Sequence, residues 1–277
     1  MIEDLKESYY LGCYTKVVND STSFRKEDEE VEFIVLRSRL ALNQIDFVLN
    51  ATRSQANNVQ KGINMLANAL KLQDDQEILN LLDTADKSLL KLSDYYAICI
   101  AIIHLRVKNY TDALMVLNGV EHDEAVALRI QSLISINRID LAESELPDIK
   151  DPNLSKVCAA HIGIVKGGDS ARDSLYSIQD ISDRGISTPL LQNMLAACFF
   201  AVGEWENASS AMIVASEKFT SDETTIINQA VALSHGTDYE KLQTQLNLVR
   251  SLKNPYTAGI EEMLKDFDQT AARLQAD

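Results

Sequence analysis

The stretch LQNMLAACFFAVGEWENASSAMIVA, residues 191–215, decides the fold class. Apolar residues return every three or four positions on both sides of Gly203, which is the spacing of one face of an α-helix. Glycine tolerates the left-handed conformation that ends a helix. Trp205 then offers an aromatic side chain to fill the space between two helices, and the small Ala208 lets the helices approach closely. The stretch therefore predicts a helical hairpin.

The same pattern, an aromatic residue or isoleucine followed three positions later by alanine, valine or leucine, returns along the chain. Successive copies are 31, 65, 29, 66 and 34 residues apart. A unit of about 33 residues explains the short steps, and two units explain each long step if copies around Leu79 and Ser174 are degenerate. The six pairs are Tyr14/Val17, Ile45/Val48, Tyr110/Ala113, Ile139/Ala142, Trp205/Ala208 and Tyr239/Leu242. The turn residues before them are Gly12, Asn43, Asn109, Asn137, Gly203 and His235-Gly236.

This period is typical of tetratricopeptide-like helix-turn-helix repeats, which bury their apolar faces only by stacking. Thr188-Pro189 and Asp151-Pro152 each offer a capping side chain followed by proline at the first helical position. We predict an all-α fold in which about eight hairpins, the middle ones degenerate, and a closing C-terminal helix form one repeat domain over residues 1–277. The hairpins stack into a curved α-α superhelical solenoid. The alternative is a generic helical bundle in which the pairs coincide by chance.

Composition agrees with helices and excludes some partners. The chain has 277 residues, 46% of them apolar, but only 10 Gly and 4 Pro to punctuate a sheet protein. Acidic residues outnumber basic residues by 41 to 26, which gives a net charge of −15. That charge repels a phosphate backbone or an anionic lipid surface, so we expect no nucleic-acid partner and only indirect membrane association.

The chain reads as intracellular. Met1–Tyr10 carries acidic residues and lacks the basic start and apolar run of a signal peptide. The most apolar stretch, Tyr95–Leu105, is about half the length that crosses a bilayer. The cysteines are far apart and suit small buried side chains in a reducing compartment rather than disulfides or zinc ligands. They are Cys13, Cys99, Cys158 and Cys198.

Few residues offer catalytic chemistry. Cys158 and His161 lie three positions apart on a predicted helix, as a nucleophile and base or two metal ligands could. Both fall on positions that pack between helices, and no orienting group is near in sequence, so we interpret them as core residues. The other histidines, His104, His122 and His235, are scattered along the chain. We therefore predict no catalytic residues, no metal and no cofactor.

Two further motifs have a structural interpretation. Gly167-Gly168-Asp169-Ser170 lacks the Lys-Ser/Thr of a phosphate-binding loop and does not follow a strand-like run, so we expect a turn between helices. The acidic run Glu27-Asp28-Glu29-Glu30 could bind cations or basic partners, but it more commonly forms a solvated first turn of a helix, where the dipole favours negative charge.

A partner could bind the concave face of such a solenoid. The first helix of each pair lines that face, and residues spaced i, i+3, i+7 and i+10 point into the groove. Phased from Ala113 and Ala208, this spacing gives a largely apolar groove suited to a hydrophobic partner segment. The alternative is that these side chains pack against an adjacent helix of the same chain. The candidate groove residues are Tyr95, Ile98, Ile102, Leu105, Leu190, Asn193, Ala197 and Phe200.

Three segments resemble a known family, the coatomer epsilon subunits. Residues 8–14, SYYLGCY, are similar to that family's first helix and turn, and residues 191–208 to its late Asn-x-x-Ala-Ala-Cys and Gly-x-Trp-x-x-Ala repeat. Asn254-Pro255-Tyr256 and Asp266-Phe267-Asp268 are similar to its closing helix. The resemblance covers essentially the whole chain and departs from the family over residues 51–88 and 147–152.

The resemblance implies a non-enzymatic structural subunit of the COPI coat that binds the C-terminal domain of the coatomer alpha subunit in retrograde Golgi-to-ER transport. It also implies a cytoplasmic protein, peripheral at the Golgi membrane and on COPI-coated vesicles. The alternative is a tetratricopeptide adaptor or co-chaperone that holds acidic C-terminal peptides with a basic clamp, although the central groove residues are apolar. A helical enzyme using Cys158 and His161 is a third hypothesis.

Overall fold

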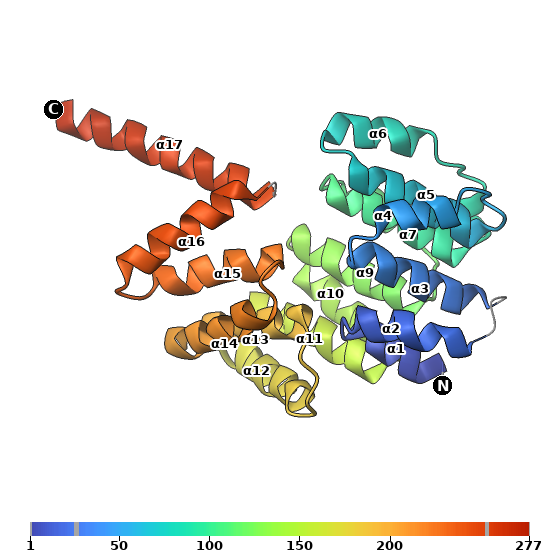
Figure 1. Ribbon diagram of the computed structural model, residues 1–277, viewed down its shortest axis with the longest axis horizontal. Coiled ribbons are helices and arrows are strands. Elements are labelled where there is room, and N and C mark those ends of the chain that lie inside the picture. Colours follow the sequence, from blue (N-terminus) through green and yellow to red (C-terminus); the bar gives the residue numbers. More distant parts are fainter. Residues whose placement is uncertain (1, 25–27, 253–254, 277) are drawn as a thin grey trace. The chain divides into compact units, whose positions relative to one another are not determined.

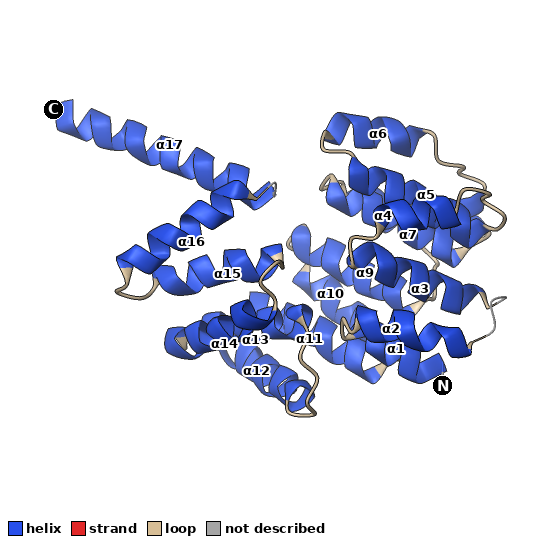
Figure 2. Cartoon of the chain, viewed as in Figure 1, coloured by secondary structure: helices blue, strands red, loops and turns tan. Residues whose placement is uncertain are grey.

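The computed structural model describes residues 2–24, 28–252 and 255–276. All regular secondary structure in these residues is helical and no strand occurs among them, which confirms the predicted all-α class (Figure 2). The chain forms two compact units, residues 1–188 and 189–277, and each is described by itself.

Helices follow one another in pairs within each unit (Figure 1). The first unit contains α1 (Ile2–Tyr10), α2 (Tyr14–Asp20), α3 (Glu29–Ala41), α4 (Ile45–Ala51), α5 (Asn58–Lys71), α6 (Asp75–Asp83), α7 (Asp94–Arg106), α8 (Tyr110–Val116), α9 (Asp123–Ser135), α10 (Ile139–Glu145), α11 (Pro152–Lys166) and α12 (Gly168–Ser182). Short 3₁₀ turns cover Ser21–Ser23, Leu89–Lys91 and Leu146–Asp148. The second unit contains α13 (Pro189–Val202), α14 (Trp205–Lys218), α15 (Glu223–Ser234), α16 (Tyr239–Ser251) and α17 (Pro255–Ala276).

The repeated sequence pairs mark the second helix of a hairpin. Each of the six aromatic or isoleucine residues is the first residue of such a helix, as Trp205 is of α14 and Ile139 of α10. The residue three positions later faces the first helix, and Ala113, Ala142 and Ala208 have no exposed surface. Neighbouring helices therefore pack in hairpins, which confirms the tetratricopeptide-like class.

Five of the six turns that precede these helices share one hydrogen-bond pattern. Gly203 is left-handed at φ 80°, its N–H donates to the carbonyl of Phe200, and the N–H of Glu204 donates to the carbonyl of Phe199 at 2.9 Å. This is the Schellman arrangement, which satisfies the last carbonyls of the first helix. The same arrangement recurs in four other turns, each time with a left-handed residue two positions before the second helix. The left-handed residues of these turns are Gly12, Asn43, Lys108 and Asn137.

Two of the predicted turns lie where expected but place their backbone differently from the sequence pattern. Lys108, at φ 57°, takes the left-handed conformation, and Asn109 follows it at φ −88° just before α8. Before α16, His235 has φ −91° and Gly236 is not left-handed; there the helix start is capped by Asp238, which accepts a hydrogen bond from the N–H of Lys241. In the five turns that share the pattern, the left-handed residue lies two positions before the next helix. In the turn before α8 that residue is Lys108, although a left-handed conformation is strained for lysine.

The copies that are degenerate in sequence keep the buried contact three positions into the second helix, although their turns differ. Helix α6 begins at Asp75 and buries Ile78 three positions later, while α12 begins at Gly168 and buries Ala171. Polar or flexible residues replace the aromatic residue at the start of both helices. The small or apolar contact residue is kept, because it packs between the two helices.

Prolines and acidic caps set several helix starts. Helices α11 and α13 begin at Pro152 and Pro189, as predicted. Asp151 accepts hydrogen bonds from the N–H groups of Asn153 and Leu154 at 3.0 and 2.7 Å. Asp28 caps α3 in the same way, so the acidic run supplies a helix start; Glu27 lies outside the described residues.

Each unit has its own apolar core. In the first unit one continuous cluster extends from Leu5 in α1 to Ile162 in α11 and includes the fully buried Phe33 and Ile130. In the second unit a much smaller cluster joins α13, α14 and α15. Its fully or nearly buried members are Ala196, Met212, Ala215 and Ala232.

Candidate partner-binding surface

Helix α7 carries four of the predicted groove residues, and the structure separates them by depth. Ile98 has no exposed surface and lies in the core of the first unit. Tyr95, Ile102 and Leu105 are half-buried against the same core and keep part of their surface in solvent. Of the four predicted groove residues on α7, only these three can therefore reach another protein.

Tyr95 also packs within the chain. Its ring lies 4.9 Å from that of Phe33 in α3, centroid to centroid, and 5.6 Å from the imidazole of His122, which meets it edge-on. Phe33 and His122 are 6.4 Å apart, so the three rings form one cluster between α3, α7 and the start of α9. Burial raises the pKa of the Tyr95 hydroxyl, and nearby carboxylates, Glu30 first, add to the effect.

Helix α13 carries the other four predicted residues, in the second unit. Leu190 is 38% exposed, and Ala197 and Phe200 are half-buried. Asn193 is buried. Its amide nitrogen donates to the hydroxyl of Thr225 at 2.9 Å, and its amide oxygen accepts a hydrogen bond from Asn228 at 2.8 Å. Asn193 therefore joins α13 to α15, and Leu190 and Phe200 present the larger apolar surfaces.

A buried polar network on the inner helices of the first unit was not predicted. The guanidinium of Arg37 in α3 donates to a carboxylate oxygen of Glu124 in α9 at 2.9 Å and to the hydroxyl of Tyr9 in α1 at 3.2 Å. That hydroxyl donates to Glu124 at 3.1 Å. Nearby, the amide of Asn153 in α11 donates to Glu7 at 2.9 Å. Residues more than 100 positions apart therefore meet, which no local sequence signal indicates.

Burial governs the charges in this network. It raises the pKa of the Tyr9 hydroxyl well above its usual value, although the positive charge of Arg37 opposes the shift. For Arg37, burial alone would lower the pKa, but the partners Tyr9 and Glu124 outweigh it and the guanidinium stays charged. The three groups thus form a charged, hydrogen-bonded link between α1, α3 and α9.

The cysteine and histidine pair on α11 lacks the properties of a catalytic dyad. Burial raises the pKa of the Cys158 thiol to about 12, whereas a nucleophilic cysteine needs a lowered pKa. Burial also lowers the pKa of His161. Cys158 is 7% exposed and belongs to the core cluster, as its position in the repeat predicts.

The remaining motifs are structural. Gly167 and Gly168 are left-handed and form the turn between α11 and α12. Among the described residues, no three His, Cys, Asp or Glu side chains are grouped as metal ligands. No helix in the described part of the chain combines the length and the apolar character needed to span a membrane.

Helical hairpins with recurring turns define a tetratricopeptide-like repeat protein. A family model described as coatomer epsilon subunit matches residues 2–275. The chain belongs to the coatomer epsilon subunit family.

Relatives in several organisms agree. The chain is 24% identical to coatomer subunit epsilon of Dictyostelium discoideum, over 97% of both chains. It is 25% identical to coatomer subunit epsilon-1 of Oryza sativa subsp. japonica, over 90% of this chain and 89% of that protein. It is 24% identical to coatomer subunit epsilon-2 of Arabidopsis thaliana, over 88% and 87%. Family membership makes the chain a structural subunit of the larger coatomer complex, the cytoplasmic COPI coat of transport vesicles.

Proposed function

We propose that this subunit binds the C-terminal domain of the coatomer alpha subunit and so takes part in retrograde Golgi-to-ER transport at Golgi membranes and on COPI vesicles. The observation that carries the proposal is the family match over residues 2–275, which includes both helical units. A subunit of a larger coat needs at least one stable contact within it, and helical repeats bind partners through an extended surface.

The surface of α7 supports an apolar contact. Ile102 and Leu105 lie one turn apart on α7 and expose part of their side chains although they pack on the core. Apolar side chains of this kind favour a partner that stays bound, because separating the subunits would expose them again. On α13, Leu190 offers a similar contact in the second unit.

The test is co-expression of the full chain with a tagged C-terminal domain of the coatomer alpha subunit. We expect recovery in equal amounts and a single dissociation constant by calorimetry. Ile102→Asp is expected to weaken the complex at least 30-fold, about 2 kcal/mol, since it places a carboxylate in an apolar contact.

The matched control is Met115→Asp on α8. Met115 is also a large apolar residue in the first unit and is 68% exposed, but it is not one of the predicted groove residues. We expect unchanged affinity. Equal loss in both variants would show that charge alone weakens the complex, and no complex with the unaltered chain would reject the alpha subunit as partner. Tight binding of short acidic C-terminal peptides instead would favour an adaptor.

A further inference from the structure

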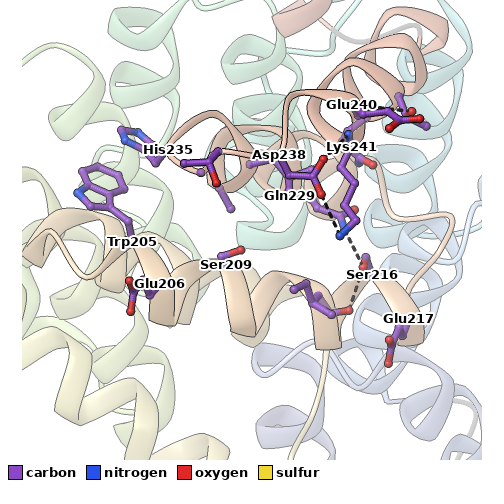
Figure 3. A pocket seen from close by; sticks show the side chains of 17 residues that line it. Trp205, Glu206, Ser209, Ser216, Glu217, Gln229, His235, Asp238, Glu240 and Lys241 are labelled. Atoms are coloured by element: carbon purple, nitrogen blue, oxygen red, sulfur yellow. Dashed lines mark hydrogen bonds and ion pairs between the residues drawn. The ribbon is translucent and has the colours of Figure 1, made fainter.

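The second unit contains a groove that the coat contact proposed above does not use. It has a volume of about 960 Å³ and runs between α14 and α16 over the end of α15 (Figure 3). One wall is a stripe of α14 residues four positions apart, which share one face of the helix. These residues are Trp205, Ser209, Ile213 and Glu217.

The apolar part of the groove is exposed. Trp205 and Ile213 both line the groove, and 39% and 48% of their surfaces are exposed to solvent. The indole of Trp205 is fixed by stacking on the ring of His235, with centroids 3.6 Å apart. Rigid, partly exposed aromatic and aliphatic groups at one site are typical anchors for another protein.

Polar groups on the floor of the groove are already hydrogen-bonded to other parts of the chain. The amide of Gln229 donates to the hydroxyl of Ser216 at 3.1 Å, and the amide of Gln245 donates to the carbonyl of Ile226 at 2.8 Å. Recognition there consequently depends on apolar contact and on charge rather than on hydrogen bonds from the floor.

The rim is acidic. Lys241 forms an ion pair with Asp238 at 3.0 Å, so these two charges offset each other. Three exposed carboxylates, Glu206, Glu217 and Glu240, also line the groove, and none forms an ion pair with another described residue. A wall with exposed apolar side chains and a rim of unneutralised carboxylates are together complementary to a basic, amphipathic ligand.

The walls favour a helix as the ligand. Helices surround the groove, and their backbone groups are bonded internally, so an extended peptide would find no strand edge to pair with. From Trp205 to Glu217 the α14 wall rises about 18 Å, the length of a helix of about twelve residues. We propose that the α14–α16 groove binds a basic amphipathic helix of about three turns from another protein.

The probe is a 14-residue peptide of leucine and lysine, capped at both ends and labelled with a fluorophore, with the leucines spaced to form one helical face. One comparison peptide has glutamate in place of lysine, and a second has the same composition with the leucines scattered. With the full-length chain, we expect saturable one-to-one binding of the first peptide in fluorescence anisotropy. Its affinity should fall as salt rises, and the other two peptides should bind at least tenfold more weakly.

Matched variants locate the site. Ile213→Ser should weaken binding about five- to tenfold, whereas Val214→Ser should not, since Val214 is the next residue of α14 and 56% exposed but does not line the groove. A double variant that combines Glu206→Gln and Glu217→Gln should weaken binding about three- to tenfold. The control is a double variant that combines Glu77→Gln and Glu121→Gln, which changes the net charge equally on exposed residues of the other unit. It should leave binding unchanged.

The proposal is overturned if the lysine peptide does not bind, if both members of a matched set weaken it equally, or if the glutamate peptide binds as well. A photo-crosslinker on the peptide gives a second readout. Crosslinks to residues 205–217 or 229–245 support the groove, and crosslinks elsewhere exclude it. Because none of these residues lies on α7, binding of the alpha subunit is measured separately and its outcome stays distinguishable.

Discussion

Single contact positions decide how closely two helices approach. Gly163 in α11 faces α12, and a Cβ atom there would lie 2.6 Å from the backbone oxygen of Ser170 and 2.1 Å from the hydroxyl oxygen of Ser174. A serine side chain can rotate away, but a backbone oxygen cannot. The position therefore requires glycine for packing, although glycine costs stability inside a helix.

Gly163→Ala should lower the free energy of unfolding by about 1–3 kcal/mol, because the added methyl group pushes α11 and α12 apart. The free energy of unfolding is measured by urea denaturation, with circular dichroism as the signal. Gly259→Ala is the control, since Gly259 lies in α17 and, beyond its chain neighbours and its own helix backbone, no described atom lies within 4 Å of the added carbon. That substitution should be neutral or stabilising by up to about 1 kcal/mol. A destabilisation of equal size in both would contradict the packing argument.

The thiols should differ in reactivity. Burial raises the pKa of Cys99, Cys158 and Cys198 to about 12, so almost no thiolate forms near pH 7. Cys13 is half-exposed. With a mild aromatic disulfide reagent, we expect Cys13 to react first and the other three only after unfolding, at any pH between 7 and 9. Fast labelling of Cys158 in the native chain would revive a catalytic interpretation.

Helices α1, α3 and α9 are joined by a link that is charged as well as apolar. The side chains of Arg37 and Glu124 are 20% and 10% exposed, so each depends on the other, and on Tyr9, for its polar contacts. Breaking a buried ion pair costs more than the pair contributes, because it leaves one charge without a partner.

Glu124→Leu and Arg37→Met should each lower the free energy of unfolding by about 3–5 kcal/mol, and the double variant should cost at least about 1 kcal/mol less than their sum. Chemical denaturation of the four proteins completes the cycle. Glu143→Ala is the control, because its ion pair with Lys166 is exposed and should contribute less than about 1 kcal/mol. Additive losses would mean that Arg37 and Glu124 do not interact.

Helix α7 shows what repeat spacing can predict. The interval i, i+3, i+7, i+10 places Tyr95, Ile98, Ile102 and Leu105 on one helix face, and four such positions do lie on α7. Their depth depends on what packs over that face, and α3 and the start of α9 cover part of it. The sequence of α7 carries no information about that cover, so it could not distinguish the core residue Ile98 from its half-exposed neighbours.

The whole chain divides into units with unequal cores. Among the described residues, one continuous cluster joins eleven helices of residues 1–188, from Leu5 to Ile162, while a cluster of the second unit joins three. Less apolar burial gives less stability. Long repeat arrays lose cooperativity where the coupling between neighbours is weak, so the two units need not unfold together.

Trp205 is the one tryptophan of the chain and reports on the second unit alone. In urea, its fluorescence should change at a lower midpoint than the far-ultraviolet circular dichroism, which follows all helices. A shared midpoint would indicate instead that residues 1–277 unfold as the single domain that the repeat pattern predicts. Replacing Met212 by alanine should move the fluorescence midpoint further down, because Met212 is a fully buried member of the smaller core.

Local sequence patterns were enough to predict the class of fold, the family and the starts of the second helices. These depend on local periodicity, on turn geometry and on contacts three or four residues apart, all of which are written within one repeat. The folded structure was needed to show that Lys108 adopts the left-handed turn, that Tyr9, Arg37 and Glu124 meet, and that an acidic groove lies between α14 and α16. Such features arise where helices from different repeats come together, and their free energy depends on partners that local spacing does not specify.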